Sequence, residues 1–195
     1  MLYRDMPKTG DRLSILGCGG MRFPGRQTNP NEKKAIQQIR YAIDKGVNYV
    51  DTAWPYHTGK SETIVGKAIK DGYREKVKIA TKLPQWLVKS RSDMDKYLDS
   101  SLERLEIDAI DYYLVHAIDG AAWKRMKELD ITAFLNEAKQ GGKIVNVGFS
   151  YHGSKDDFIG IVDDYDWDFC QIQFNILDEH VQAGSAGLNH ARPKN

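Results

Sequence analysis

Residues 110–115 read Ile-Asp-Tyr-Tyr-Leu-Val and are followed by His116. This nearly continuous apolar run predicts a strand of a parallel sheet that is covered on both faces. Outward along the chain, comparable short runs begin near residues 47, 77, 144 and 169, so that strands recur every 25 to 34 residues. With one earlier unit in the same register, the other predicted strands are Leu13–Gly17, Val47–Ala53, Val77–Thr81, Ile144–Phe149 and Phe169–Phe174.

Segments with helical periodicity fill the intervals between these strands. The first is expected to begin with Asn29 as a side-chain cap, Pro30 in the first turn and Glu32 three residues after the cap, and to end at Gly46. This alternation is typical of the α/β class. No low-complexity linker interrupts it, and the length suits one core, so residues 1–195 are expected to form a single domain.

An open doubly wound sheet and a (β/α)8 barrel both alternate strands with helices. The glycine-rich segment at residues 17–22, Gly-Cys-Gly-Gly-Met-Arg, favours the barrel, because it lacks the third glycine of G-x-G-x-x-G and no helix opens directly on it. We therefore predict a (β/α)8 barrel of the TIM type, incomplete, with about six βα units. Ahead of them, residues 2–4 and 12–14 flank Lys-Thr-Gly at 8–10 and predict a short β-hairpin that caps the bottom of the barrel.

The composition points to a small-molecule function. Lys plus Arg (28) nearly balances Asp plus Glu (27), which favours neither nucleic acid nor an anionic membrane as a partner. No run of 18 apolar residues and no signal-peptide core is present, so we expect a soluble, cytoplasmic protein. The two cysteines, Cys18 and Cys170, lie in no metal-ligand spacing. We expect them to be buried thiols and expect no metal site.

Polar side chains stand at the carboxyl ends of the predicted strands, which converge on one mouth in a parallel barrel. Taken singly, each has an ordinary explanation, such as a helix cap, a solvated lysine or a buried histidine with its bonds satisfied. Their shared placement after apolar strands indicates a functional site. The residues are Asp51 and nearby Tyr56, then Lys82, His116, Ser150, Gln173 and Asn175.

Five segments resemble the aldo-keto reductase family, in the family's order, across residues 1 to about 190. The first two are similar to the family's segments around its catalytic aspartate and tyrosine and around its lysine. The third is similar to the histidine strand, and the last two to segments that contact the nicotinamide carboxamide. They are Val50-Asp51-Thr52-Ala53-Trp54-Pro55-Tyr56 with Gly59, Ser61-Glu62 and Gly66; Ala80-Thr81-Lys82-Leu83; Asp111-Tyr112-Tyr113-Leu114-Val115-His116; Val147-Gly148-Phe149-Ser150; and Gln171-Ile172-Gln173-Phe174-Asn175.

This resemblance implies hydride transfer from NADPH, or alternatively NADH, to an aldehyde or ketone. Tyr56 would be the general acid that protonates the carbonyl oxygen, although a phenol with a pKa near 10 is a reluctant donor. Lys82 would stabilise the phenolate, and Asp51 would hold Lys82 as its ion-pair partner. His116 would hydrogen-bond the substrate oxygen and orient it.

The resemblance also assigns binding residues. Ser150 and Gln173 would hold the carboxamide, and Asp51, Gly20 and Met21 would join them in cofactor binding. The fifth strand departs from the family, because Tyr151 stands where asparagine is common. Two tryptophans in loops at the mouth, Trp54 and Trp86, could line an apolar substrate pocket or pack in the core. Two further histidines, His57 and His152, are expected to be exposed loop residues.

A barrel of this family has eight strands, and only six are visible in the sequence, so we expect a C-terminally truncated form. Its two open edges would favour self-association and leave the isolated chain with low activity. Two alternatives to a reductase stay open: a regulatory binding module that retains the fold, and an inactive gene fragment.

Overall fold

The structure is a computed structural model that describes residues 1–192, in which strands and helices alternate along the chain. The strands are β1 Tyr3–Asp5, β2 Arg12–Ser14, β3 Cys18–Gly19, β4 Gly25–Arg26, β5 Asn29–Pro30, β6 Tyr49–Asp51, β7 Lys78–Leu83, β8 Ile110–Ile118, β9 Ile144–Tyr151 and β10 Phe169–Ile172. The helices are α1 Glu32–Asp44, α2 Lys60–Ala68, α3 Arg91–Leu105, α4 Gly120–Glu128, α5 Ile131–Gln140, α6 Lys155–Asp164 and α7 Gly184–Ala191.

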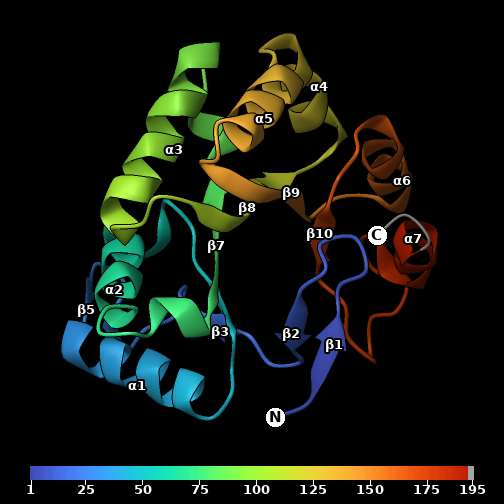
Figure 1. Ribbon diagram of the computed structural model, residues 1–195. Coiled ribbons are helices and arrows are strands. Elements are labelled where there is room, and N and C mark those ends of the chain that lie inside the picture. Colours follow the sequence, from blue (N-terminus) through green and yellow to red (C-terminus); the bar gives the residue numbers. More distant parts are fainter. Residues whose placement is uncertain (193–195) are drawn as a thin grey trace.

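Within residues 1–192 the main sheet has six strands, all parallel, in the order β3, β6, β7, β8, β9, β10. Each strand pairs with the next one along the chain, whereas a doubly wound sheet reverses its order part-way. The helices lie in an arc outside the strands, from α1 through α3 and α5 to α6 and α7 (Figure 1). This arrangement confirms the predicted incomplete (β/α)8 barrel.

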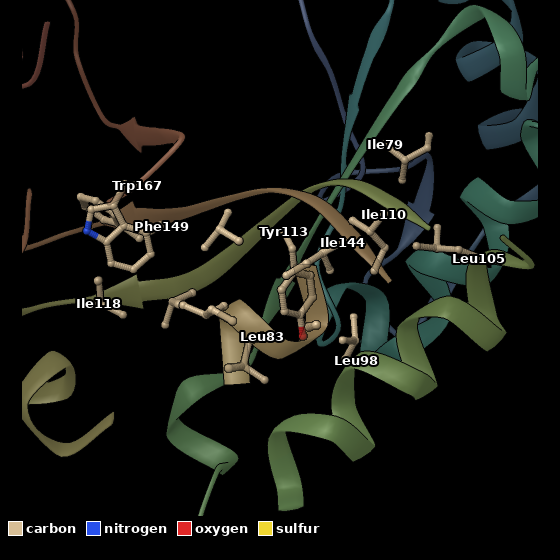
Figure 2. Packing of buried hydrophobic residues seen from close by; sticks show 14 of the residues in the cluster. Ile79, Leu83, Leu98, Leu105, Ile110, Tyr113, Ile118, Ile144, Phe149 and Trp167 are labelled. Atoms are coloured by element: carbon tan, nitrogen blue, oxygen red, sulfur yellow. The ribbon is translucent and has the colours of Figure 1, made fainter. Parts of the chain in front are cut away.

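Alternate residues of β8 feed two apolar clusters, one on each face of the sheet. Tyr113 and Val115 belong to the larger cluster between the strands and the surrounding helices. Figure 2 shows Tyr113 in this cluster, pointing toward Leu98 of α3. Tyr112 and Leu114 belong to the smaller cluster on the inner face. The continuous apolar run of residues 110–115 is therefore explained by burial on both sides of the strand.

The β1–β2 hairpin closes the inner cluster, as the sequence predicted. Its strands pair antiparallel, and Met6 and Leu13 pack against the inner-face residues. The hydroxyl of Tyr112 donates to a carboxylate oxygen of Asp11 at 2.7 Å and lies 3.1 Å from the hydroxyl of Thr9. These polar contacts tie the hairpin loop to the centre of the sheet.

Several elements differ from the sequence prediction. The strands β6 and β10 are shorter than the predicted Val47–Ala53 and Phe169–Phe174. The first parallel strand is β3, not Leu13–Gly17, because Leu13 already pairs within the hairpin. The cap of α1 is Asn31, whose side chain accepts the Lys34 amide, whereas Pro30 pairs within the small β4–β5 ribbon. The helix α4 was not predicted, because its buried apolar contacts are confined to Trp123 and Met126.

No helix in the described part of the chain has both the length and the apolar character needed to cross a membrane. Cys18 and Cys170 lie in β3 and β10 as half-buried free thiols. Burial raises the pKa of the Cys170 thiol to about 11, so this group is uncharged at neutral pH.

Candidate active site

A buried ion pair joins the ends of β6 and β7. The Nζ atom of Lys82 donates to both carboxylate oxygens of Asp51, at 2.6 and 2.7 Å, and to the carbonyl oxygen of Thr52 at 2.7 Å. Only 2% of the Lys82 side chain and 16% of the Asp51 side chain are exposed. Burial lowers the pKa of Lys82, and the Asp51 carboxylate offsets part of that shift because it favours the charged ammonium.

Tyr56 lies between this pair and His116. Its ring centroid is 5.1 Å from Lys82 Nζ and 5.7 Å from the His116 ring, which meets it edge to face. Lys82 therefore lies near the ring of Tyr56, while its hydrogen bonds go to Asp51 and Thr52. Burial, followed by the negative charge of Asp51, raises the pKa of Tyr56 to about 12. Stabilisation of the phenolate by Lys82 does not set this pKa, because its two causes are burial and the charge of Asp51, and both raise it.

His116 was expected to follow its strand, but it lies inside β8. The pairing of β8 with β9 shifts between Val115 and Ile118, and Ala117 in this bulge has a positive φ of 48°. Bulges of this kind redirect a side chain and are frequent beside active sites. Burial, then the charges of Lys82 and His152, lower the pKa of His116 to about 3. The imidazole is consequently neutral at physiological pH.

Because the pKa of His116 is lower in the folded chain, the free energy of unfolding should depend on pH. The unfolded chain binds a proton at His116 near pH 6.5, whereas the folded chain does so only near pH 3. The contribution of neutral His116 to the free energy of unfolding is therefore complete above pH 6.5. It is lost as the pH falls toward 3, by at most about 1.4 kcal/mol per pH unit.

We expect the substitution His116→Asn to flatten the pH dependence of the free energy of unfolding across this window. Urea unfolding at several pH values would measure it, with His180→Asn as the control, because His180 is an exposed histidine. Equal slopes in the wild type and in His116→Asn would contradict the assignment of the shift to His116.

Tyr56, Lys82 and His116 line one pocket of about 170 Å³ together with Ser150 and Gln173. The hydroxyl of Ser150 accepts the backbone N–H of Ala117 at 2.8 Å. Among the described residues, two buried polar atoms of this pocket have no hydrogen-bond partner: Nδ1 of His116 and Oε1 of Gln173. Buried polar atoms are normally paired, so these two atoms mark a place where a ligand would complete the bonding. The pocket is also lined by His152, Gln171 and Ile172. None of these three was predicted as a site residue: His152 was expected to be an exposed loop residue, and Gln171 and Ile172 stood only within a segment that resembles the family.

A second buried ion pair lies behind Lys82. Glu62 of α2 is fully buried, and it accepts the Thr81 hydroxyl at 2.6 Å and a guanidinium N–H of Arg104 at 3.3 Å. Thr81 directly precedes Lys82 in β7, so this network fixes the strand that carries the lysine. The Ser61-Glu62 pair was noticed in the sequence only as part of a family pattern, and its partner Arg104 was missed.

Three other predicted site residues, Gly20, Met21 and Trp86, lie outside the lining of this pocket. Gly20 donates its N–H to the Asp51 carbonyl at 2.7 Å, and a Cβ there would lie 2.7 Å from Ser61 Oγ, which gives this glycine a packing role. Met21 is exposed. The ring of Trp86 is half exposed and lies 5.1 Å from the ring of His116, which lines the pocket.

Trp54 does not line the pocket. Its ring packs on Tyr97 of α3 at 5.0 Å, and the guanidinium of Arg104 lies 4.5 Å from the ring centroid. The structure therefore favours the packing role that was one of its two predicted roles. The expectation for His57 was wrong, because its side chain is buried, whereas His152 is exposed as predicted. Among the described residues no cluster of His, Cys, Asp or Glu side chains is arranged to hold a metal ion.

Comparison with known proteins identifies the family. The model of the aldo/keto reductase family matches residues 15–188. The chain belongs to the aldo-keto reductase family. The aldo-keto reductase YhdN of Bacillus subtilis is 36% identical over 160 residues, which are 77% of this chain and 47% of that relative. The chain spans about half the length of the curated relatives it matches.

Solved structures of aldo-keto reductases share the fold. The holo form of the aldo-keto reductase AKR11C1 from Bacillus halodurans is 28% identical and has a TM-score of 0.76, over 92% of this chain and 59% of that one. The aldo/keto reductase from Klebsiella pneumoniae in complex with NADP and acetate is 25% identical and has a TM-score of 0.60, over 76% of this chain and 49% of that one. These matches confirm the family and the fold predicted from the sequence.

Proposed function

We propose that this chain carries the catalytic site of an NAD(P)H-dependent reductase that converts aldehydes or ketones to alcohols. The observation that carries the proposal is the convergence of Asp51, Tyr56, Lys82 and His116, with the first three joined by contacts of the Lys82 ammonium and the fourth against the Tyr56 ring. A proton donor, a fixed positive charge and a neutral hydrogen-bonding group thus surround one small pocket.

Tyr56 is the proton donor in this proposal. With a pKa raised to about 12, its phenol stays protonated at neutral pH and holds a proton ready for transfer. When a hydride adds to the carbonyl carbon, the C=O π bond breaks and the oxygen becomes an alkoxide. An alkoxide is a stronger base than a phenolate, so proton transfer from Tyr56 is downhill as the charge develops. The ammonium of Lys82, 5.1 Å from the ring centroid, then stabilises the resulting phenolate.

Asp51 and His116 have supporting roles. Asp51 keeps Lys82 charged in a buried environment and holds its Nζ atom in place with two hydrogen bonds. His116 is neutral, and its Nδ1 atom has no partner among the described residues. A neutral imidazole can hydrogen-bond the substrate oxygen without placing a second positive charge near the Lys82 ammonium. Trp86, beside His116, provides an apolar wall for the substrate.

The residues present fit a nicotinamide cofactor. Ser150 accepts the Ala117 N–H, so its own hydroxyl proton remains to be donated, and Gln173 offers an unpaired Oε1 acceptor. A donor and an acceptor side by side match the oxygen and the amino group of a carboxamide. When bound, the reduced nicotinamide supplies the hydride. NADP is the favoured cofactor, because a 25% identical relative was solved with NADP, and NAD remains the alternative.

The test is turnover by the purified protein. We expect NADPH absorbance to fall on addition of small aldehydes or ketones, at the low rate predicted for the isolated chain, with one alcohol formed per NADPH consumed. Binding of NADPH without consumption across an aldehyde and ketone panel would favour the regulatory binding module instead. If the protein neither binds nor consumes NADPH, the proposal as a whole is contradicted.

A further inference from the structure

The backbone that directly follows Tyr56 is strained. His57 has φ 53° and ψ 41°, Thr58 has φ 56° and ψ 36°, and Gly59 has φ 89°. Two consecutive residues with a Cβ atom in the left-handed region are costly, and such a conformation persists only where the surrounding contacts impose it. The position of Tyr56 therefore depends on whatever holds this left-handed turn.

The buried side chain of His57 provides the contacts. It is 1% exposed, and its ring stacks on that of Phe23, with centroids 5.3 Å apart and an interplanar angle of 8°. Its Nε2 atom accepts the backbone N–H of Phe23 at 3.0 Å, and its Nδ1 atom lies 3.0 Å from the carbonyl oxygen of Gln27. Because Nε2 accepts and Nδ1 must donate, these two bonds fix one neutral tautomer.

The segment that His57 contacts is itself anchored. Gly25 and Arg26 pair with residues of β5, and Asn31 at the start of α1 donates its N–H to the Pro24 carbonyl at 2.6 Å. Phe23 belongs to the main core cluster and is 7% exposed. Residues 23–31 therefore form a fixed support, and His57 connects the Tyr56 turn to it.

We propose that His57 is a positioning residue: its two hydrogen bonds to the Phe23–Gln27 segment hold the left-handed turn that presents Tyr56 to Lys82 and His116. This inference rests on the proposed function, in which Tyr56 donates the proton. His57 lies outside the pocket lining and contacts none of the groups placed there to bind ligands. Its effect is on the orientation of the phenol and not on binding.

Two variants separate the hydrogen bonds from the packing. His57→Phe keeps a ring to stack on Phe23 but loses both hydrogen bonds, and we expect kcat to fall about 10 to 100-fold, since small misplacements of a reacting group have effects of this order. The KM and the Kd for NADPH should change less than about two-fold, because the binding groups are untouched. His57→Asn keeps an amide near the Nδ1 position and tolerates positive φ, so its kcat should fall only about 3 to 10-fold.

Amide hydrogen exchange of residues 53–63 gives a readout independent of turnover. We expect faster exchange in His57→Phe than in the wild type, an intermediate rate in His57→Asn and no change in the control His180→Phe, which alters an exposed histidine. If the wild type consumes NADPH and His57→Phe has the same kcat, the positioning role is wrong while the proposed function stands. If the wild type does not consume NADPH, the proposed function fails and the positioning role with it. Should His57→Phe not fold, wild-type kcat in His57→Asn would overturn the inference.

Discussion

Replacing Tyr56 with phenylalanine is expected to lower the rate of carbonyl reduction by about 10² to 10⁴-fold, the usual range for loss of general acid catalysis. The substitution removes one hydroxyl and keeps the ring that packs against Lys82 and His116. The ion pair of Lys82 with Asp51 does not involve the Tyr56 hydroxyl, so the fold and the cofactor site should survive. Single-turnover kinetics with NADPH and an aldehyde would measure the chemical step.

The matched control is Tyr41→Phe, which removes the hydroxyl of an exposed tyrosine on α1. It should leave both the rate and the NADPH affinity unchanged. If Tyr56→Phe also reduces at the wild-type rate, another group donates the proton and the mechanism proposed for Tyr56 is wrong. If NADPH affinity falls together with the rate, the hydroxyl contributes to binding and its loss cannot be read as loss of an acid alone.

The fold could be predicted from the sequence because its strands and helices are encoded by short-range patterns of apolar residues. Buried parallel strands such as 110–115 need apolar residues on both faces, and the helices between them need one apolar stripe, so both leave a regular record in the sequence. Parallel strands in register also end on the same side of the sheet. For this reason Lys82, His116, Ser150 and Gln173 could be grouped before their positions were known, and they do line one pocket.

Features that depend on contacts between distant segments could not be predicted in this way. His57 looks like an ordinary loop residue until the chain is folded, because its partners Phe23 and Gln27 are 34 and 30 residues away. The bulge at Ala117, which turns the chain after His116, depends on pairing with β9. The sequence predicts Trp54 in a loop at the barrel mouth, but it does not show that the ring packs against Tyr97 and Arg104 of α3.

Removing the charge of Asp51 should have the largest effect on stability. In Asp51→Asn the ammonium of Lys82, 2% exposed, loses its only carboxylate contact in the described part of the chain and keeps the Thr52 carbonyl. Breaking a buried pair by removing one partner typically costs about 3 to 5 kcal/mol, because an uncompensated charge is left in a buried site. Urea unfolding at pH 7 would measure the loss. The control is Glu32→Gln in the exposed pair with Lys67, which should cost less than about 1 kcal/mol.

The sign of the pH dependence identifies the cause. Without Asp51, burial depresses the pKa of Lys82 further in the folded chain and is opposed by the charge of Glu62, while the unfolded chain keeps a pKa near 10.4. The unfolded chain then binds more protons at this residue, so the stability of Asp51→Asn rises with pH up to about 10.4. The stability of the wild type rises less over the same range, because Asp51 offsets part of the shift at Lys82. The gap to the wild type should therefore narrow between pH 7 and pH 9. A gap that is constant or widens over this range would mean that the loss comes from packing or hydrogen bonding at Asp51 and not from the buried charge of Lys82.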